Sequence, residues 1–426
     1  MRIFLSIWPL LIAAALLLST NGMQSTALGL RGISEGFSTG LIGLLVSIYS
    51  LGFIFGCQFA PRFIASVGHI RAFVAFASIA SAAALAHAIY VDQTFWLILR
   101  FISGFSFAAI QMILESWLNE TADNKSRGKV LSIYRITDFS TVTMAQAAIG
   151  LFDPDKFVIF AVISIAFSIS LVPIALTRIS APQVPASVKL DLRGLWKLSP
   201  MAAAASVTVG LTSSSFWSMS PVFVTGLNYD GSVTGLFLGA IILGGAVAQW
   251  PIGWLSDQMD RRRVLMVCAA GALITAGFLP FGAMQGNVSI LVLGAFTFGV
   301  FALCTFGLAV AHANDHAAPG TSVQVNGGLL MLHGSAAVVG PMGASFVMRM
   351  AGPQSLFFWI AAIYAVLFVF SAYRLFKRAA PERTDSYVPV PRTSPAVFGL
   401  DPRGDTEAEA PDETAGAKPA PAATTP

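Results

Sequence analysis

The chain has 426 residues, of which 55% are hydrophobic and only 11% are charged, and its mean hydropathy is +0.73. A soluble chain carries roughly a quarter charged residues, so this composition excludes a soluble globular protein and indicates a polytopic membrane protein. The formal net charge is only +4, and no basic face with interleaved aromatic residues occurs, so nucleic acid is not an expected partner.

The N-terminus begins like a secretory signal peptide, because one Arg precedes the apolar stretch LSIWPLLIAAALLL. The apolar character continues to Leu30, which is long enough to span a bilayer, and no clear small-x-small cleavage site follows. We therefore predict that this segment is retained as the first transmembrane helix.

Apolar runs of the length needed to cross a bilayer, about 20 residues, recur along the chain. Twelve such runs lie between charged or Pro/Gly breaks, near residues 5–29, 38–61, 71–91, 94–118, 130–151, 157–177, 201–227, 232–255, 263–284, 287–313, 322–349 and 353–375. The polar segment RISAPQVPASVKLDLRGLWKLSP divides them into six and six. We predict an all-α polytopic membrane protein: a six-helix bundle over 1–179, a cytoplasmic linker over 180–200 and a second bundle over 201–378.

The loops between these runs differ in their content of Lys and Arg, which orients membrane proteins because cytoplasmic loops are enriched in both. With the N-terminus inside, the outer loops hold only Arg31, Lys156 and Arg349. The inner loops and the end of the last run hold Arg62, Arg71, Lys125, Arg127, Lys129, Arg178, Lys189, Arg193, Lys197, Arg261, Arg262, Arg263, Arg374, Lys377 and Arg378. We expect a bacterial inner-membrane protein with both termini in the cytoplasm.

Residues 379–426 are rich in Pro, Ala, Thr and acidic residues. Such a composition does not build a core, so we predict a disordered cytoplasmic tail.

Several classes of chemistry are not expected. The three cysteines, Cys57, Cys268 and Cys304, lie in apolar runs without metal-binding spacing and are expected to be packed, reduced thiols. The sequence has no HExxH, no Gly-rich phosphate loop and no Ser/His/Asp arrangement, and the inner loops are too short to house a catalytic domain. We expect neither an enzyme nor an ATP-driven pump, and no cofactor or metal.

A weak internal repeat relates the two halves. A shift of 195 residues places Gly104 on Gly299, and Asn119 on Asn314, at equivalent ends of the fourth and tenth runs. Two six-helix repeats with a substrate site between them near the membrane midplane is a known transporter plan.

The loop after the eighth run, GWLSDQMDRRR, resembles the cytoplasmic loop signature of the major facilitator superfamily, Gly-x-Leu-x-Asp-(Arg/Lys)-x-Gly-Arg-(Arg/Lys). It departs from the signature at Gln258 and Asp260, and the equivalent loop of the first half has Ala65 where the Asp is usual. The matching residues are Gly253, Leu255, Asp257, Arg261 and Arg262. An Asp beside Arg residues is suited to a breakable ionic latch.

The fourth run contains Arg100 and Gly104, similar to the superfamily's Arg-x-x-x-Gly motif. The stretches ESWLNETADNKSRGKVLSIYRITDF, APRFIASVGHIRAF and FWSMSPVF are similar to a bacterial branch, the YcaD-like permeases. The resemblance implies a transporter of twelve helices in two bundles, and it names no substrate.

Charged residues inside the predicted spans are costly and face a cavity or a partner. Arg100, Gln111 and Glu115 share one stripe of the fourth helix, and Arg135 and Asp138 share a stripe of the fifth. Glu115 and Arg135 lie at similar depths, about 6 and 8 Å from the cytoplasmic end at ~1.5 Å per residue.

We predict that Glu115 and Arg135 form an ion pair at a cytoplasmic gate; direct contact with substrate is the alternative. The pair is expected to close in the outward-facing state and to break in the inward-facing state. The remaining predicted gate residues are Glu120, Arg127, Gly253, Asp257, Arg261 and Arg262.

Asp138 is deeper, about 12 Å from the same end by the helical rise, and is the candidate for proton coupling, because a buried carboxylate can titrate near neutrality. The alternative is a structural salt bridge with Arg135, one turn away. Arg100 has two interpretations as well: it holds an anionic substrate, or it bonds to the polar stretch of the first helix.

Polar residues of several runs are candidates to line a substrate cavity. For each, hydrogen bonding between helices is an equal alternative. The candidates are Asn21, Gln24, Arg100, Gln111, Gln146, Ser214, Trp217, Thr305 and His333. Few of them are charged, so the expected substrate is small and neutral or carries one negative charge.

Together these observations predict a secondary transporter, expected to be a proton-coupled monomer, that moves a small organic solute by alternating access. Drug or metabolite efflux by antiport remains open, although the fifth run lacks the Gly-Pro motif usual in drug antiporters. A membrane sensor that does not transport is the other alternative.

Overall fold

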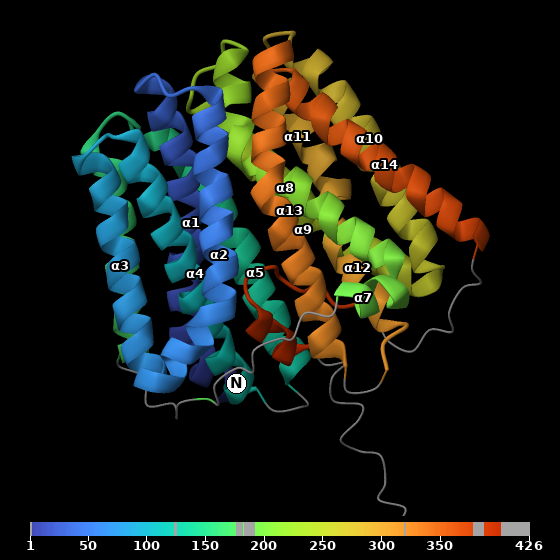
Figure 1. Ribbon diagram of the computed structural model, residues 1–426, viewed down its shortest axis with the longest axis horizontal. Coiled ribbons are helices and arrows are strands. Elements are labelled where there is room, and N and C mark those ends of the chain that lie inside the picture. The colour runs from blue at the N-terminus through green and yellow to red at the C-terminus, as the bar shows by residue number, and fades with distance from the viewer. Residues whose placement is uncertain are drawn as a thin grey trace, which may run out of the picture.

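The computed structural model describes residues 2–122, 126–175, 182, 192–318, 321–377 and 387–401. The described residues are helical apart from turns and short extended stretches, and they contain no β-strand (Figure 1).

The first half of the chain forms one bundle of long helices. Gly68, with φ +86°, separates the second helix from the third, and the side chain of Asp92 caps the fourth by accepting a hydrogen bond from the backbone N–H of Phe95 (2.8 Å). The helices are α1 (Arg2–Ser34), α2 (Thr39–Val67), α3 (His69–Ile89), α4 (Gln93–Thr121), α5 (Arg127–Ala148) and α6 (Phe157–Ala175). The short 3₁₀ helix η1 (Ile149–Leu151) lies between α5 and α6.

The second half forms the other bundle. Its tenth predicted run is broken at Leu303 and Cys304 into two helices. The elements are α7 (Leu192–Leu198), α8 (Pro200–Gly226), α9 (Val233–Gln258), α10 (Arg261–Ala283), α11 (Val288–Ala302), α12 (Thr305–Asn314), α13 (Ser322–Ala351) and α14 (Ser355–Lys377).

Ten segments of the described chain are long and apolar enough to cross a membrane, with α11 and α12 together counting as one. Two further long helices, α5 with 22 residues and α8 with 27, are not among these ten; α5 carries charged side chains, and α8 is rich in Ser and Thr. With these two, the described residues contain the twelve helices that the sequence predicts.

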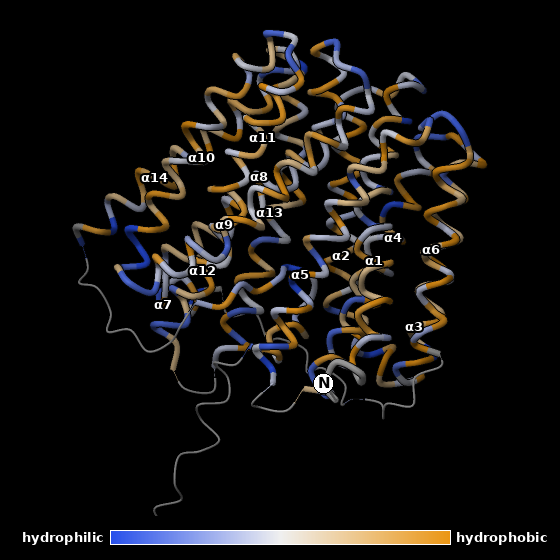
Figure 2. The backbone as a smooth tube through the Cα atoms, turned by 180° about the vertical axis from the view of Figure 1, so that it is seen from behind, coloured by the Kyte–Doolittle hydropathy of each residue, from blue (hydrophilic) through white to orange (hydrophobic). Residues whose placement is uncertain are grey.

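The surface of the helices is suited to lipid. Figure 2 shows hydrophobic residues along the middle of the helices and hydrophilic ones at both ends of the molecule. Large apolar side chains project outward, among them Trp250 (80% exposed) and Val366 (70% exposed), as expected where hydrocarbon replaces water.

The internal repeat is visible in how helices cross. A Cβ on Gly104 of α4 would overlap the carbonyl oxygen of Tyr49 on α2, and a Cβ on Gly299 of α11 would overlap that of Ile241 on α9. At both the α2–α4 and the α9–α11 crossing, a glycine therefore lets one helix pack directly against the backbone of the other, at the same place in each half. Small residues have this role in other close helix contacts in membranes.

The two bundles meet differently at the two ends of the molecule. We call the end where α1 begins the tail end and the opposite end the far end (Figure 1). Near the far end, helices of the two bundles touch directly: a Cβ on Gly29 of α1 would lie 2.8 Å from Pro221 of α8, and one on Gly43 of α2 would lie 2.8 Å from the carbonyl oxygen of Pro341 on α13. The far end is therefore closed by helix packing.

At the tail end, the bundles are separated by residues 387–401, which include the 3₁₀ helix η2 (Pro395–Leu400) and lie between α5 and α13 (Figure 1). Val397, Phe398 and Leu400 are at most 2% exposed. The prediction of a disordered tail is therefore wrong for this stretch, because its apolar side chains find a core between the bundles.

Candidate functional site

A cavity of about 290 Å³ lies between the two bundles. It is lined from the first bundle by α1, α2, α4 and α5, from the second bundle by α8 and α13, and on the tail side by Arg392 and Thr393. Its polar side chains are Asn21, Ser25, Tyr49, Ser50, Arg135, Asp138, Ser213, Ser214, Trp217, His333, Arg392 and Thr393.

Of the nine predicted cavity residues, four line this space: Asn21, Ser214, Trp217 and His333. Ser214 donates its hydroxyl to the carbonyl of Gly210 in its own helix (2.7 Å), and the His333 ring packs against Phe306 with 5.5 Å between centroids.

Arg100 is 1% exposed and lies behind the cavity wall rather than in it. Its guanidinium stacks on the Tyr49 ring at 4.2 Å and donates to the carbonyl of Leu45 and the hydroxyl of Ser25, both at 3.4 Å. The Tyr49 hydroxyl donates in turn to Asn21 at 2.7 Å. The sequence left two roles for Arg100, binding of an anionic substrate or bonding to the polar stretch of α1. Its position matches the second role, because it contacts Ser25 of α1.

The other four candidates are buried between helices and do not line the cavity. Gln146 accepts a hydrogen bond from Thr26 of α1 (3.0 Å), Gln111 donates to the Tyr134 hydroxyl (3.3 Å), and Thr305 donates to the carbonyl of Phe301 in the preceding helix (3.2 Å). Gln24 is 2% exposed. The hydrogen bonds of Gln146, Gln111 and Thr305 join helices, as hydrogen-bonding residues in membranes do.

The predicted ion pair between Glu115 and Arg135 is not formed. Glu115 is fully buried and accepts hydrogen bonds from the hydroxyls of Tyr134 (2.8 Å), Thr393 and Ser394. Tyr134 and Arg135 are neighbours on α5, so their side chains point about 100° apart around the helix. Tyr134 is the one that faces α4, and Arg135 is turned into the cavity.

Arg135 pairs instead with Asp138, with 2.5 Å between Nη1 and Oδ2. The Arg135 guanidinium also lies over the Phe139 ring, 4.0 Å from its centroid. The Asp138 side chain is 16% exposed and that of Arg135 14%. The cavity therefore holds one carboxylate beside one guanidinium, which is the salt bridge that the sequence offered as an alternative for Asp138.

A second guanidinium, that of Arg392, reaches the same cavity from the tail and lies 5.8 Å from the centroid of the Phe306 ring. Burial, and then the neighbouring Arg135, lower the pKa of Arg392 to about 10, so it stays positively charged at neutral pH.

The α9–α10 turn forms an ionic cluster. Arg261 is 1% exposed and contacts Asp257 of α9 (3.2 Å), Asp315 beyond α12 and the carbonyl of Ala311 (3.0 Å). Asp257 also accepts a hydrogen bond from the backbone N–H of Tyr387 (2.8 Å). The predicted latch residues thus connect helices of the second bundle with the tail.

The remaining predicted gate residues lie around these groups. Arg262 donates to both carboxylate oxygens of Asp260, at 3.1 and 2.6 Å, and a Cβ on Gly253 would overlap the Tyr387 ring. Glu120 is exposed at the end of α4, and Arg127 is half-buried at the start of α5.

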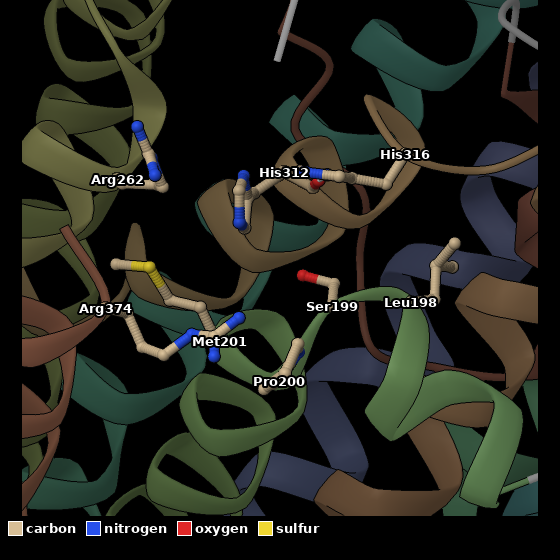
Figure 3. A pocket seen from close by; sticks show the side chains of 8 residues that line it. All are labelled: Leu198, Ser199, Pro200, Met201, Arg262, His312, His316 and Arg374. Atoms are coloured by element: carbon tan, nitrogen blue, oxygen red, sulfur yellow. Dashed lines mark hydrogen bonds between the residues drawn. The ribbon is translucent and has the colours of Figure 1, made fainter. Parts of the chain in front are cut away.

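A second hollow at the tail end, lined by eight residues that include His312, His316, Arg262 and Arg374, is drawn in Figure 3. Its volume of about 10 Å³ has room for roughly one water molecule. It is too small for an organic solute. The candidate site is the central cavity, because that space lies between the two bundles and is lined by charged side chains.

Sequence reasoning missed Tyr49, Tyr134, Tyr387 and Arg392. Tyr134 directly precedes the charged residue that it displaces from Glu115. Arg392 lies in SYVPVPRTSPAVFGLD, where apolar residues interrupt the polar tail, and this was the available signal.

Comparison with known proteins agrees with this architecture. The sequence model of the Major Facilitator Superfamily matches residues 10–327 and 202–399. An uncharacterized MFS-type transporter, YcaD of Escherichia fergusonii, is 22% identical over 359 residues, 83% of this chain and 92% of that protein. An uncharacterized MFS-type transporter of Enterobacter sp. is 24% identical over 364 residues, with the same coverage.

Among solved structures, the nucleoside transporter NupG is similar with a TM-score of 0.74 and 15% identity, over 89% of this chain and all of that one. A bacterial homologue of the human lysosomal transporter Spinster, in an inward-facing and occupied conformation, has a TM-score of 0.68 and 14% identity, over 87% of this chain and 98% of that one. At this identity the two structures support the fold alone. Since the family match spans most of its length, the chain belongs to the Major Facilitator Superfamily.

Proposed function

We propose that this secondary transporter carries a small polar organic solute through the central cavity and that Asp138 couples its movement to protons. The observation that carries the proposal is the cavity between the bundles, with its single carboxylate–guanidinium pair. The cavity volume of about 290 Å³ lies at the lower limit of small-molecule sites, which favours a metabolite-sized solute over a bulky drug.

The groups around Asp138 support the proposal that it couples transport to protons. Arg135, Arg392 and His333 also line the cavity, and Arg135 is in direct contact with the carboxylate. A proton on Asp138 would cancel the charge that holds Arg135, so protonation and the position of Arg135 would be linked. Release of Arg135 toward an anionic or hydrogen-bonding solute would then join solute binding to proton binding.

The orientation is part of the proposal. The tail end carries, among others, Arg62, Arg71, Lys197, Arg261 and Arg374, whereas the far end carries Arg31, Lys156 and Arg349. Because cytoplasmic loops are enriched in Lys and Arg, we place the tail end and both termini in the cytoplasm of a bacterial cell, with the chain acting as a monomer in the inner membrane.

The test is flux in proteoliposomes. Solutes that raise the melting temperature of the purified protein are selected first, and their uptake is then measured with and without a pH gradient. We expect accumulation of at least one such solute that depends on the gradient. A solute that stabilises the protein but is not moved in either direction would favour the sensor alternative. If uptake is unchanged when the pH gradient is collapsed, transport is not coupled to protons.

A further inference from the structure

Residues 387–401, here called the tail segment, contact both bundles at the tail end (Figure 1). On the first bundle, the hydroxyls of Thr393 and Ser394 donate to Glu115 of α4, and Gly399 packs against the Asn119 side chain so closely that a Cβ would overlap it. Ser394 is fully buried there. The segment therefore occupies a surface of α4 that has a complementary shape.

On the second bundle, Tyr387 fits a notch formed by two glycines. A Cβ on Gly253 of α9 or on Gly307 of α12 would overlap Tyr387. The Tyr387 hydroxyl donates to Gln249 (2.8 Å), and its backbone N–H donates to Asp257 (2.8 Å). The signature residues Gly253 and Asp257 thus act as a receptor for the tail in this structure.

Between these two anchors, the segment reaches the cavity. Arg392 and Thr393 form part of its wall, beside Asp138 and Arg135. The far end is closed as well, by the contacts of α1 with α8 and of α2 with α13. Packed helices therefore lie on one side of the cavity and the tail segment lies on the other.

We propose that the tail segment is an autoinhibitory plug: it binds between the bundles, closes the tail end of the cavity, and must withdraw before solute is exchanged there. Withdrawal removes the Arg392 guanidinium from the cavity and two of the three hydroxyl donors from Glu115. It also removes the link that the segment makes between α4 and α9. The role in flux rests on the proposed transport function, but plug binding itself does not.

Cysteine labelling tests the plug without any substrate. The reporter is Ala337→Cys, because Ala337 lines the cavity and is 8% exposed. The reporter is introduced after replacement of Cys57, Cys268 and Cys304. Its labelling rate is then compared in the full chain, in a chain ending at 386 and in a chain ending at 401. The chain ending at 401 keeps the plug and is the matched control for truncation. Ser289→Cys, exposed at the far end, controls for general reactivity.

In detergent, a water-soluble thiol reagent should modify Ala337→Cys about tenfold faster or more in the chain ending at 386 than in the other two, because closure then no longer limits access. Ser289→Cys should react equally in all three. A synthetic peptide of residues 387–401 should slow labelling of the shortened chain, at concentrations up to the millimolar range expected for a tethered segment, and a scrambled peptide should not.

Equal labelling of Ala337→Cys in the three folded chains would overturn the plug. The variant Tyr387→Ala in the full chain provides a second test if the shortened chain does not fold: it should speed labelling, whereas Tyr373→Ala, on the exposed surface of α14, should not. Faster labelling without flux in any chain would support the plug and count against transport. Faster labelling together with faster flux in the chain ending at 386 would support both.

Discussion

At the scale of single residues, the proposed proton coupling depends on the carboxylate of Asp138. The variant Asp138→Asn keeps the shape of the side chain but binds no proton, so pH-driven accumulation should fall to the level of empty liposomes. Exchange of solute across the membrane without a gradient should persist, since it needs no net proton movement. Asp153→Asn is the control, because Asp153 is an exposed acid of the far end whose side chain is 47% exposed. Unchanged pH-driven uptake by Asp138→Asn would contradict the proposal.

Tyr134 stabilises the buried carboxylate of Glu115. Among the described residues, three hydroxyls donate to Glu115, and only that of Tyr134 lies outside the tail segment. The variant Tyr134→Phe should lower stability by on the order of 1 kcal/mol, the usual loss when a buried acceptor loses one partner, and should lower the melting temperature. In the chain ending at 386 the loss should be larger than the sum of the two changes, because the carboxylate then has no donor. Tyr373→Phe serves as the control, and simple additivity would argue against this network.

Glycines govern the packing of whole elements. The variants Gly104→Ala and Gly299→Ala each place a methyl group against a backbone carbonyl at equivalent helix crossings, so both should lower the melting temperature and by similar amounts. Gly277→Ala in α10 is the matched control, since a Cβ there meets nothing within 4 Å. That change should be neutral or stabilising by up to about 1 kcal/mol, because Ala favours a helix over Gly. A strong loss from only one of the first two variants would count against an equivalent role in the two halves.

At the element scale, the sequence predicted the helices well and their pairing less well. Apolar runs set the positions of the spans because hydrocarbon leaves the backbone no partner except itself. The pairing of Glu115 was misassigned because one residue of difference turns a side chain by about 100°, and a sequence alone does not fix the rotation of α5. Residues 387–401 were misjudged because the composition of the whole tail hid Val390, Val397, Phe398 and Leu400, which only become a buried set when both bundles are present.

For the whole molecule, alternating access requires the far end to open. A Cβ on Gly150 would lie 3.2 Å from the Cβ of Ser232, across the two bundles, and disulfides join Cβ atoms about 3.5–4.5 Å apart. The double variant Gly150→Cys/Ser232→Cys should cross-link when oxidised and lose flux. Flux should return on reduction, while each single variant should be unaffected by oxidant. Full flux in the oxidised, cross-linked protein would show that the bundles need not separate there.

The position of Arg392 beside Asp138 also has a consequence for anyone who measures ligand affinity. If the guanidinium and a solute share one space, the full chain binds solute only during the fraction of time in which the space is vacant. The apparent Kd is the intrinsic Kd divided by that fraction, so a chain that is vacant 1% of the time reports an affinity about 100-fold too weak. A ligand screen is therefore more sensitive on the chain ending at 386, and the ratio of the two apparent Kd values measures how firmly the tail segment is held between the bundles.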